Sequence, residues 1–330
     1  MLNPDAHLSE KLFADDIEKA STRDGFGRGV IEAGSADSRV VVLCADLAES
    51  TRAEWFQKEF PERFVEMGVA EQNMATVASG MAAAGKIPFI ASYAVFSPGR
   101  NYEQIRTTIA INTMPVKICG MHTGVSVGPD GATHQMLEDI GMMRMLPGMT
   151  VLAPCDAEEA RKAVIAVAKT NGPVYIRFGR PATPSFTTPE TPFQIGKALT
   201  LWDTPVGEPK VALFSTGSLS YAALLAARAL ADDGIESIVL HMPTIKPLDE
   251  EAILNAAKRA GRVVTIEEHQ VAGGFGSAVA EFLSQNYPVP MHLIGVQDEF
   301  GQSGESDELM AHYGLDAVHI ENTVRTYLAL

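Results

Sequence analysis

Short apolar runs alternate with longer stretches of helical spacing through the first half of the chain. The apolar runs lie at residues 39–46, 87–93, 115–122, 150–155 and 174–178. Continuous apolar runs of this length are typical of strands that are buried on both faces of a parallel sheet. The intervening segments predict helices, among them one over residues 8–34, which its glycines weaken, and one over residues 64–85. Strands that alternate with helices indicate an α/β layered fold.

A second alternation follows a change in composition. Between residues 181 and 208 the chain is rich in proline, which predicts a linker rather than a core element. Beyond it, four apolar runs at residues 211–216, 236–242, 262–268 and 291–296 are separated by helical segments, and two helices are expected at the end. We therefore predict two consecutive parallel-sheet α/β domains, at residues 1–190 and 209–330, which a proline-rich linker at residues 191–208 joins.

One carboxylate lies on the apolar side of the helix predicted at residues 64–85. The helix places Met74, Val77, Ala78, Met81 and Ala82 on one buried face, and Glu71 points to the same side. A glutamate is almost never fully buried without a partner, and a desolvated one can hold a proton near neutrality and transfer it. The other reading is that Glu71 only caps the first turn, where a negative charge suits the helix dipole. Helix geometry alone favours the cap.

The charge balance argues against several kinds of partner. The 330 residues include 26 Lys and Arg against 41 Asp and Glu, for a net charge of −15. Such an excess of negative charge argues against nucleic acid or an anionic membrane as a partner. No apolar run approaches the ~20 residues of a membrane span, and the acidic N-terminus has no secretory signal, so a cytoplasmic protein is expected. Cys44, Cys119 and Cys155 are isolated in or beside apolar runs, which indicates reduced core thiols rather than disulfides or a zinc site.

A glycine-rich loop follows the apolar run at residues 115–122. It reads GPDGATHQ and is preceded by His122, so that His122, Asp130 and His134 surround one turn at the end of a strand. In open α/β sheets, ligands bind at the carboxyl ends of the strands. The sequence leaves open whether these side chains converge on a ligand or a metal, or whether Asp130 is only a turn residue.

Further residues have the chemistry of a phosphate site. They are Arg23, Arg100, Arg180 and Ser50. A guanidinium group binds phosphate in bidentate fashion, and a hydroxyl beside a helix start adds a donor, although each arginine taken singly is more typical of a surface charge. Tyr93 and Phe96, three residues apart, have the chemistry to stack on a flat ring, although such a pair is more often part of a core.

Taken together, these stretches resemble the C-terminal half of transketolase, a thiamine diphosphate enzyme. The matching segments are ADLAEST (45–51), FVEMGVAEQNM (64–74), SYAVFSPGRNYEQIR (92–106), HTGVSVGPDGATHQ (122–135), YIRFGRP (175–181) and EEHQVAGGFGS (267–277). The resemblance implies a pyrimidine-binding domain followed by a transketolase C-terminal domain. Two related families share this layout. The beta subunits of 2-oxoacid dehydrogenases usually lack the DG-x-THQ loop, whereas deoxyxylulose-phosphate synthase has it, normally within one longer chain.

The resemblance implies cofactor roles for three residues. Glu71 would hydrogen-bond a ring nitrogen of the cofactor's aminopyrimidine and favour the tautomer that deprotonates the thiazolium carbon. Phe96 would stack on the pyrimidine, with Tyr93 beside it. The resemblance also implies that His122 and His134 join Glu71 among the catalytic residues, because the histidines would assist hydroxyl binding and proton movement.

The resemblance implies substrate contacts as well. Asp130 and His122 would line the substrate channel, where the aspartate reads a sugar hydroxyl. Ser50, Arg23 and Arg180 would hold the terminal phosphate of a sugar-phosphate substrate, and glycines beside Arg23 disturb the alignment there.

A segment that transketolases use for the diphosphate is missing from this sequence. Family members bind the diphosphate and its Mg²⁺ (or Ca²⁺) with a G-D-G segment and a later asparagine in the N-terminal half, and no such segment occurs here. The resemblance therefore implies no metal ligand in this chain and a partner N-terminal subunit, in an α2β2 heterotetramer that transfers a two-carbon ketol unit between sugar phosphates. The chain alone is expected to be inactive. The rival interpretations are a 2-oxoacid dehydrogenase beta subunit, a deoxyxylulose-phosphate synthase-like half, and a non-catalytic scaffolding subunit.

Overall fold

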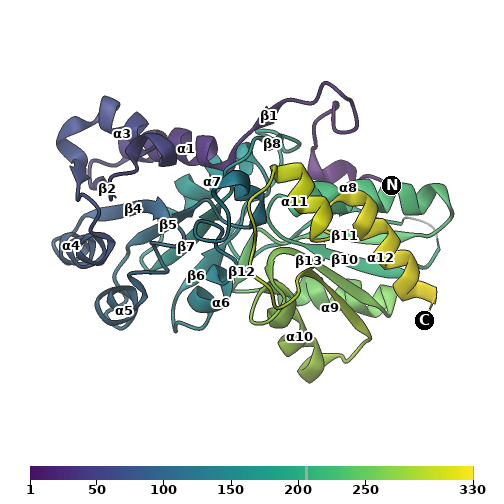
Figure 1. Cartoon of the computed structure of the whole chain (residues 1–330). Helices are drawn as coiled ribbons and strands as arrows, with labels where there is room; N and C mark the ends of the chain where they lie inside the picture. Colours follow the sequence, from purple (N-terminus) through teal and green to yellow (C-terminus); the bar gives the residue numbers. More distant parts are fainter. Residues whose placement is uncertain (205–206, 330) are drawn as a thin grey trace.

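Two sheets made mainly of parallel strands organise the chain (Figure 1). The computed structural model describes residues 1–204 and 207–329. The first sheet has the order β12-β6-β7-β5-β4-β2-β3, and the second has the order β14-β13-β10-β11-β9. Every pair in both sheets is parallel except β12 with β6 and β11 with β9. The predicted α/β class with two consecutive, mainly parallel sheets is confirmed.

The strands follow the apolar runs of the sequence. In the first sheet they are β2 (Val40–Cys44), β3 (Phe64–Glu66), β4 (Ile87–Tyr93), β5 (Lys117–Met121), β6 (Thr150–Leu152), β7 (Val174–Phe178) and β12 (Thr244–Lys246). In the second they are β9 (Leu199–Trp202), β10 (Val211–Ser215), β11 (Ser237–His241), β13 (Val263–Gln270) and β14 (Met291–Val296). All residues of the central strands β2, β5, β7, β10 and β11 are buried, as helices on both faces of a parallel sheet require.

Helices cover both sheets. Those of the first half are α1 (Thr22–Ala36), α2 (Ala48–Thr51), α3 (Ala53–Glu59), α4 (Glu71–Ala83), α5 (Tyr102–Gln104) continuing as the π-helix η3 (Ile105–Ala110), α6 (Asp139–Arg144) and α7 (Ala157–Val167). Those of the second half are α8 (Leu219–Asp232), α9 (Glu250–Ala260), α10 (Phe275–Asn286), α11 (Ser306–His312) and α12 (Ala317–Ala329). Short elements complete the chain: η1 (Pro4–Ala6), β1 (Lys19–Ala20), η2 (Pro61–Arg63), η4 (Val125–Asp130) and β8 (Thr183–Pro184).

The first helix is shorter than the sequence predicted. A helix over residues 8–34 was expected, but α1 begins at Thr22, where Ser21 and Asp24 form a capping box. The preceding residues form turns and β1, which pairs with β8. The glycines inside α1 have a packing role, because a Cβ on Gly25 would lie 2.2 Å from the backbone oxygen of Ala157 in α7. Gly25 and Gly29 therefore allow α1 and α7 to approach closely, whereas Gly27 and Gly34 face Trp55 and Phe56 of α3.

Two other predicted elements change at their edges. The helix predicted at residues 64–85 is α4 from Glu71 onward, since residues 64–66 form β3 and extend the ladder beside β2. The predicted linker contains β9, which pairs antiparallel with β11, so this stretch belongs to the second sheet. Residues 205 and 206, at the end of the predicted linker, lie outside the described residues.

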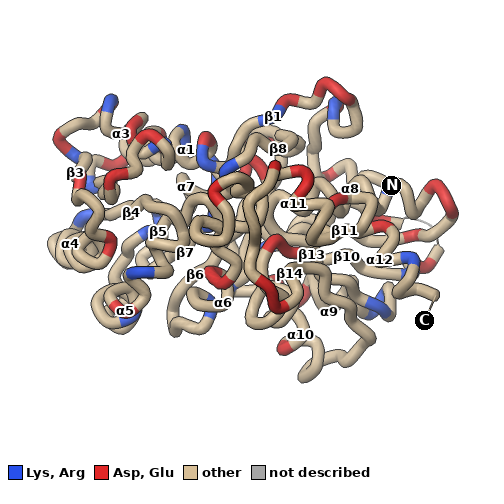
Figure 2. Tube along the Cα trace, viewed as in Figure 1, with Lys and Arg blue, Asp and Glu red and all other residues tan. Residues whose placement is uncertain are grey.

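The two sheets share one apolar core. A single cluster of buried side chains includes Ile90 and Met143 from the first half and Phe214, Leu240 and Phe275 from the second. All the cysteines are buried and free, as expected. Asp and Glu are spread over both halves with Lys and Arg interspersed (Figure 2). Within residues 1–204 and 207–329, no helix combines the length and the hydropathy that crossing a bilayer requires.

Candidate active site

Four neighbouring strands of the first sheet end beside the predicted site residues. Ser50 lies in α2 beyond β2, Tyr93 is the last residue of β4, His122 follows β5, and Arg180 lies two residues beyond β7. Because β2, β4, β5 and β7 are adjacent and parallel, their carboxyl ends meet at one edge of the sheet. This is where an open α/β sheet binds its ligands. The parallel order of these four strands therefore brings segments that are distant in sequence to one edge of the sheet.

Aromatic and imidazole rings form the centre of the site. The ring centroids of Tyr93 and His122 are 3.9 Å apart, and those of Tyr93 and Phe96 are 6.0 Å apart in a stacked arrangement. His134 packs edge-on against both aromatics, with centroids 6.0 Å from Tyr93 and 5.8 Å from Phe96. The structure thus joins four of the predicted site residues into one cluster.

Positive charge gathers on one side of this cluster. Ser50 Oγ and Tyr93 Oη are hydrogen-bonded at 2.6 Å, and Arg23 Nη1 donates to the Ser50 carbonyl at 2.8 Å. Burial, together with the neighbouring Arg52 and Arg180, lowers the pKa of Arg23. Guanidinium groups crowded in this way favour an anionic ligand. Sequence reasoning missed Arg52, because only the fold brings it beside Arg23.

His122 is a neutral imidazole at ordinary pH. Burial lowers its pKa to about 3, and the nearby Arg23 and Arg180 contribute in the same direction. Its Nδ1 is buried without a hydrogen-bond partner among the described residues. The backbone is left-handed at His122, with φ at 57°, which directs the side chain toward Tyr93. A buried polar atom without a partner in a pocket of this kind is suited to a hydrogen bond with a ligand.

Glu71 is the first residue of α4 and is buried, with 1% of its side chain exposed. Its Oε2 accepts a hydrogen bond from Arg100 Nη1 at 2.6 Å. Arg100 also lies over the Phe96 ring, with its Cζ 4.5 Å from the ring centroid. The sequence suggested Arg100 as a phosphate ligand, whereas the structure pairs it with Glu71. Glu71 lies in the first turn of α4, where a negative charge suits the helix dipole, but no side chain caps this helix start.

One predicted site residue stays apart from this cluster. Asp130 is exposed at the end of η4, and within the described part of the chain no hydrogen bond or ion pair joins it to the other site residues. His134, on the same loop, is bonded through Nδ1 to Thr133 Oγ1 at 2.9 Å. Asp130 is therefore exposed and lies outside the ring cluster.

The loop that carries His122 and His134 is held by residues that sequence reasoning missed. Glu268, in β13 of the second sheet, accepts a hydrogen bond from the Ser126 backbone at 2.7 Å. Gln135 Nε2 donates to Val125 O and to Gln302 O, both at 3.0 Å. These contacts connect the second half of the chain to the site loop. Only the tertiary fold reveals them, because Glu268 and Ser126 are 142 positions apart.

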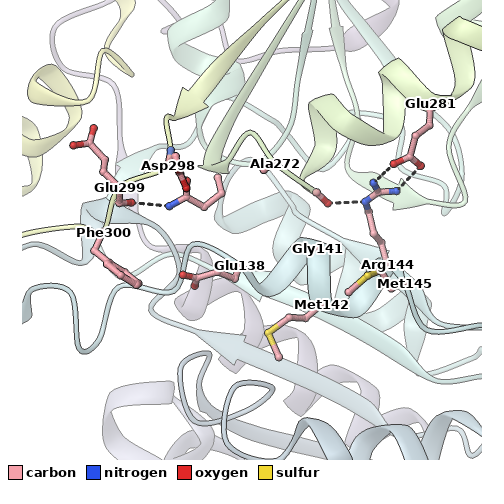
Figure 3. Close-up of a pocket in the computed structure, with 12 residues that line it drawn as sticks. Glu138, Gly141, Met142, Arg144, Met145, Ala272, Glu281, Asp298, Glu299 and Phe300 are labelled. Carbon is pink, nitrogen blue, oxygen red and sulfur yellow. Dashed lines mark hydrogen bonds and ion pairs between the residues drawn. The ribbon is translucent and has the colours of Figure 1, made fainter.

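A cleft also lies elsewhere in the structure. This cleft has a volume of about 850 Å³ and lies where α6 meets loops of the second half. Figure 3 shows Arg144 paired to Glu281 at one end of it and Phe300 at the other. Its lining contains none of the clustered residues described above. We therefore place the site by its chemistry rather than by cavity size.

A buried group at the domain junction has ligand-type side chains. Cys155, Glu159 and His241 bring potential ligand atoms within 4.8 Å of one another. These atoms already bond to each other or to neighbours: Glu159 Oε2 to His241 Nε2 at 2.8 Å, and His241 Nδ1 to Ser220 Oγ at 2.7 Å. The arrangement is a hydrogen-bonded chain between the two halves of the protein.

Comparison with known proteins identifies the family of the chain. Residues 18–185 match the family described as "Transketolase, pyrimidine binding domain", and residues 202–320 match the one described as "Transketolase, C-terminal domain". The chain belongs to the transketolase family. The two matches leave residues 186–201 between them, whereas the linker was predicted at residues 191–208.

Relatives of matching length are separate C-terminal transketolase chains. The chain is 43% identical over 305 residues to the "Putative transketolase C-terminal section" of Methanocaldococcus jannaschii, covering 92% of this chain and 94% of that protein. It is 39% identical over 307 residues to one subunit of the apulose-4-phosphate transketolase of Phocaeicola vulgatus, covering 93% and 97% respectively. A solved structure described as "Split gene transketolase, inactive beta4 tetramer" matches with a TM-score of 0.86 and 42% identity, covering 94% of this chain and 99% of that one. This transketolase chain is therefore similar over almost its whole length to the C-terminal subunit of a split transketolase.

The site residues fit the pyrimidine end of thiamine diphosphate. An aminopyrimidine offers a flat ring and N–H donors, which require an aromatic face and a carboxylate acceptor. The side chains of Phe96 and Glu71 supply both, and Arg100 already makes contacts of these two kinds.

Proposed function

We propose that this transketolase chain is the pyrimidine-binding subunit of a thiamine diphosphate-dependent enzyme that transfers a two-carbon ketol unit between sugar phosphates. The observation that carries the proposal is the pairing of two different environments at one sheet edge. A buried carboxylate beside an aromatic ring, Glu71 with Phe96, is linked through the Tyr93 and His122 rings to a cluster of guanidinium groups. The first environment suits an aminopyrimidine and the second suits a phosphate.

On the cofactor side, the chain positions a proton. Glu71 shares a proton with a ring nitrogen of the aminopyrimidine, while Phe96 supports the ring, with Tyr93 packed beside it. When bound, thiamine diphosphate supplies the nucleophilic carbon and the electron sink that carbon–carbon bond cleavage needs. Burial of Glu71 excludes water from this proton.

On the substrate side, the chain binds a phosphate and hydroxyl groups. Arg23, Arg180 and Ser50 hold the terminal phosphate of the sugar. His122 remains neutral, so it both donates and accepts hydrogen bonds without repelling the arginines. Asp130 and His134 contact sugar hydroxyls nearer the entrance, and His122 and His134 move protons between hydroxyl groups during transfer.

A partner chain completes the enzyme in this proposal. The N-terminal transketolase chain binds the diphosphate and its Mg²⁺ or Ca²⁺, and the assembly is an α2β2 heterotetramer in the cytoplasm. Two descriptions support the need for a partner: one relative is named as a subunit of its transketolase, and the matching solved structure is described as an inactive tetramer of beta chains.

Reconstitution tests the proposal. The chain, its partner chain and the mixture are each assayed for ketol transfer with thiamine diphosphate and Mg²⁺, using a ketose phosphate donor and an aldose phosphate acceptor. We expect activity only in the mixture. Full activity of this chain alone would contradict the split assignment, and a mixture that assembles but transfers no ketol unit would contradict the reaction.

A further inference from the structure

Arg100 makes both of the contacts that the proposed function assigns to the cofactor's aminopyrimidine ring. Its Nη1 donates to Glu71 Oε2 at 2.6 Å, and its guanidinium carbon lies 4.5 Å from the centroid of Phe96. A guanidinium group is planar and carries N–H donors, and so does a protonated aminopyrimidine. We propose that Arg100 is an internal stand-in for the aminopyrimidine, which binds Glu71 and Phe96 in the cofactor-free chain and is displaced when the cofactor enters. This inference rests on the proposed function.

The stand-in serves a buried carboxylate. Glu71 is 1% exposed, and a charged carboxylate buried without a partner costs several kcal/mol. Arg100 neutralises it, yet 44% of the Arg100 side chain is exposed. A half-exposed arginine regains water readily when it leaves, and exposed ion pairs contribute little free energy. Arg100 can therefore stabilise the empty site and still yield to a ligand.

The shape of the site does not depend on Arg100. Asn101 Nδ2 donates to the Glu71 carbonyl at 3.0 Å and to Ser97 Oγ at 3.1 Å, so it connects the start of α4 to the turn that follows Phe96. Asn101 is completely buried. The spacing between Glu71 and the aromatic turn is thus set by a contact that remains when the Arg100 side chain moves away.

A phosphate-binding role for Arg100 predicts a different effect of its removal on ligand binding. If Arg100 were a ligand for phosphate, as the sequence alone suggested, its removal would weaken binding of phosphorylated molecules and leave binding of an aminopyrimidine without phosphate unaffected. If it is a stand-in, its removal frees Glu71 and Phe96 and strengthens binding of the aminopyrimidine.

The test uses the full-length chain and the free hydroxymethyl-aminopyrimidine fragment of thiamine, which has no phosphate. Its dissociation constant is measured by ligand-observed NMR for the wild type and for Arg100→Met, Arg100→Lys and Arg106→Met. Arg106 is an exposed arginine on the neighbouring π-helix and serves as the matched control. We expect Arg100→Met to bind the fragment about threefold to tenfold more tightly, as the loss of a competing half-exposed ion pair implies. Arg100→Lys should lie between, and Arg106→Met should equal the wild type.

A second measurement separates competition from unfolding. Without ligand, Arg100→Met should have a lower melting temperature than Arg106→Met, because Glu71 loses its partner, and the fragment should raise its melting temperature more than that of the wild type. Equal or weaker fragment binding by Arg100→Met would overturn the stand-in role while leaving the proposed function intact. Fragment binding that is absent from all variants at saturating concentration would contradict the pyrimidine site itself, and the stand-in role with it.

Discussion

Acid sensitivity at His122 offers a direct test of the charge arrangement in the site. In the folded chain the pKa of His122 is lowered to about 3, whereas the unfolded chain has the ordinary value of 6.5. Between these values the unfolded state binds a proton that the folded state does not bind. The stability that a neutral His122 confers is therefore complete above about pH 6.5 and is lost as the pH falls toward 3.

The magnitude follows from this interval. One pH unit within it is worth about 1.4 kcal/mol, so acidification from neutrality to about pH 5 should cost about 2 kcal/mol of unfolding free energy through His122 alone. The substitution His122→Asn removes the titration and keeps a residue that tolerates the left-handed backbone found there. Its unfolding free energy should fall by about 2 kcal/mol less than that of the wild type over this pH range.

The assay is urea unfolding at several pH values, followed by circular dichroism. The exposed His7, which also has a left-handed backbone, gives the matched control His7→Asn, which should follow the wild-type pH dependence. Because two variants of one protein are compared, the titration of other groups cancels. Parallel pH dependences for the wild type and His122→Asn would refute the reasoning, since they would mean that His122 is protonated as easily in the folded chain as in the unfolded one.

The remaining predictions concern catalysis, phosphate binding and the domain junction. Glu71→Ala should abolish ketol transfer in the reconstituted enzyme while circular dichroism shows an intact fold; near-normal rates would contradict its role. Arg180→Met should raise KM for a phosphorylated substrate by roughly tenfold to a hundredfold, because one charge-assisted contact is lost, and should change KM for the unphosphorylated sugar little. Equal changes in KM for both substrates would argue against a phosphate contact. Glu159→Gln should lower the unfolding free energy by about 3 kcal/mol in urea titrations, because it leaves His241 without its carboxylate across the junction. The control Glu54→Gln, which alters a half-exposed ion pair with Lys58, should change the unfolding free energy by less than about 1 kcal/mol. Similar losses for the two variants would mean that the buried pair contributes no more to stability than the surface pair.

Sequence patterns predicted the elements whose burial is uniform. The interior strands β2, β5 and β7 are buried along their whole length, so their apolar runs were unambiguous. The edge elements were harder. Strand β3 looked like the start of a helix, and β9 looked like linker, because an edge strand needs only part of its surface covered and can contain polar residues. The glycines of α1 lowered its helix propensity for a reason that lies in other helices, α7 and α3, which pack against them.

The site was predictable in its residue types but not in its pairings. Side-chain chemistry suggested Tyr93 and Ser50, and a loop after a strand suggested His122; the structure brings the three residues together. The contact of Arg100 with Glu71 depends on the turn between Phe96 and Asn101, which places a side chain from after β4 against the start of α4. No local pattern encodes such a contact, and none encodes the approach of Arg52 to Arg23.

Each half of the chain contributes backbone pairing to the sheet of the other half, which limits how the chain can be divided. Strand β12, from the second half, is the outermost strand of the first sheet beside β6 (Figure 1), and the N-terminal residues Leu2 and Asn3 pair with β9 of the second sheet. A cut at the linker would thus deprive β6 of its neighbour and uncover β9. Unpaired strand edges of this kind invite association with other chains. Either half expressed alone is therefore a poor reagent, and fragments for crystallisation or binding studies should retain both halves in one polypeptide.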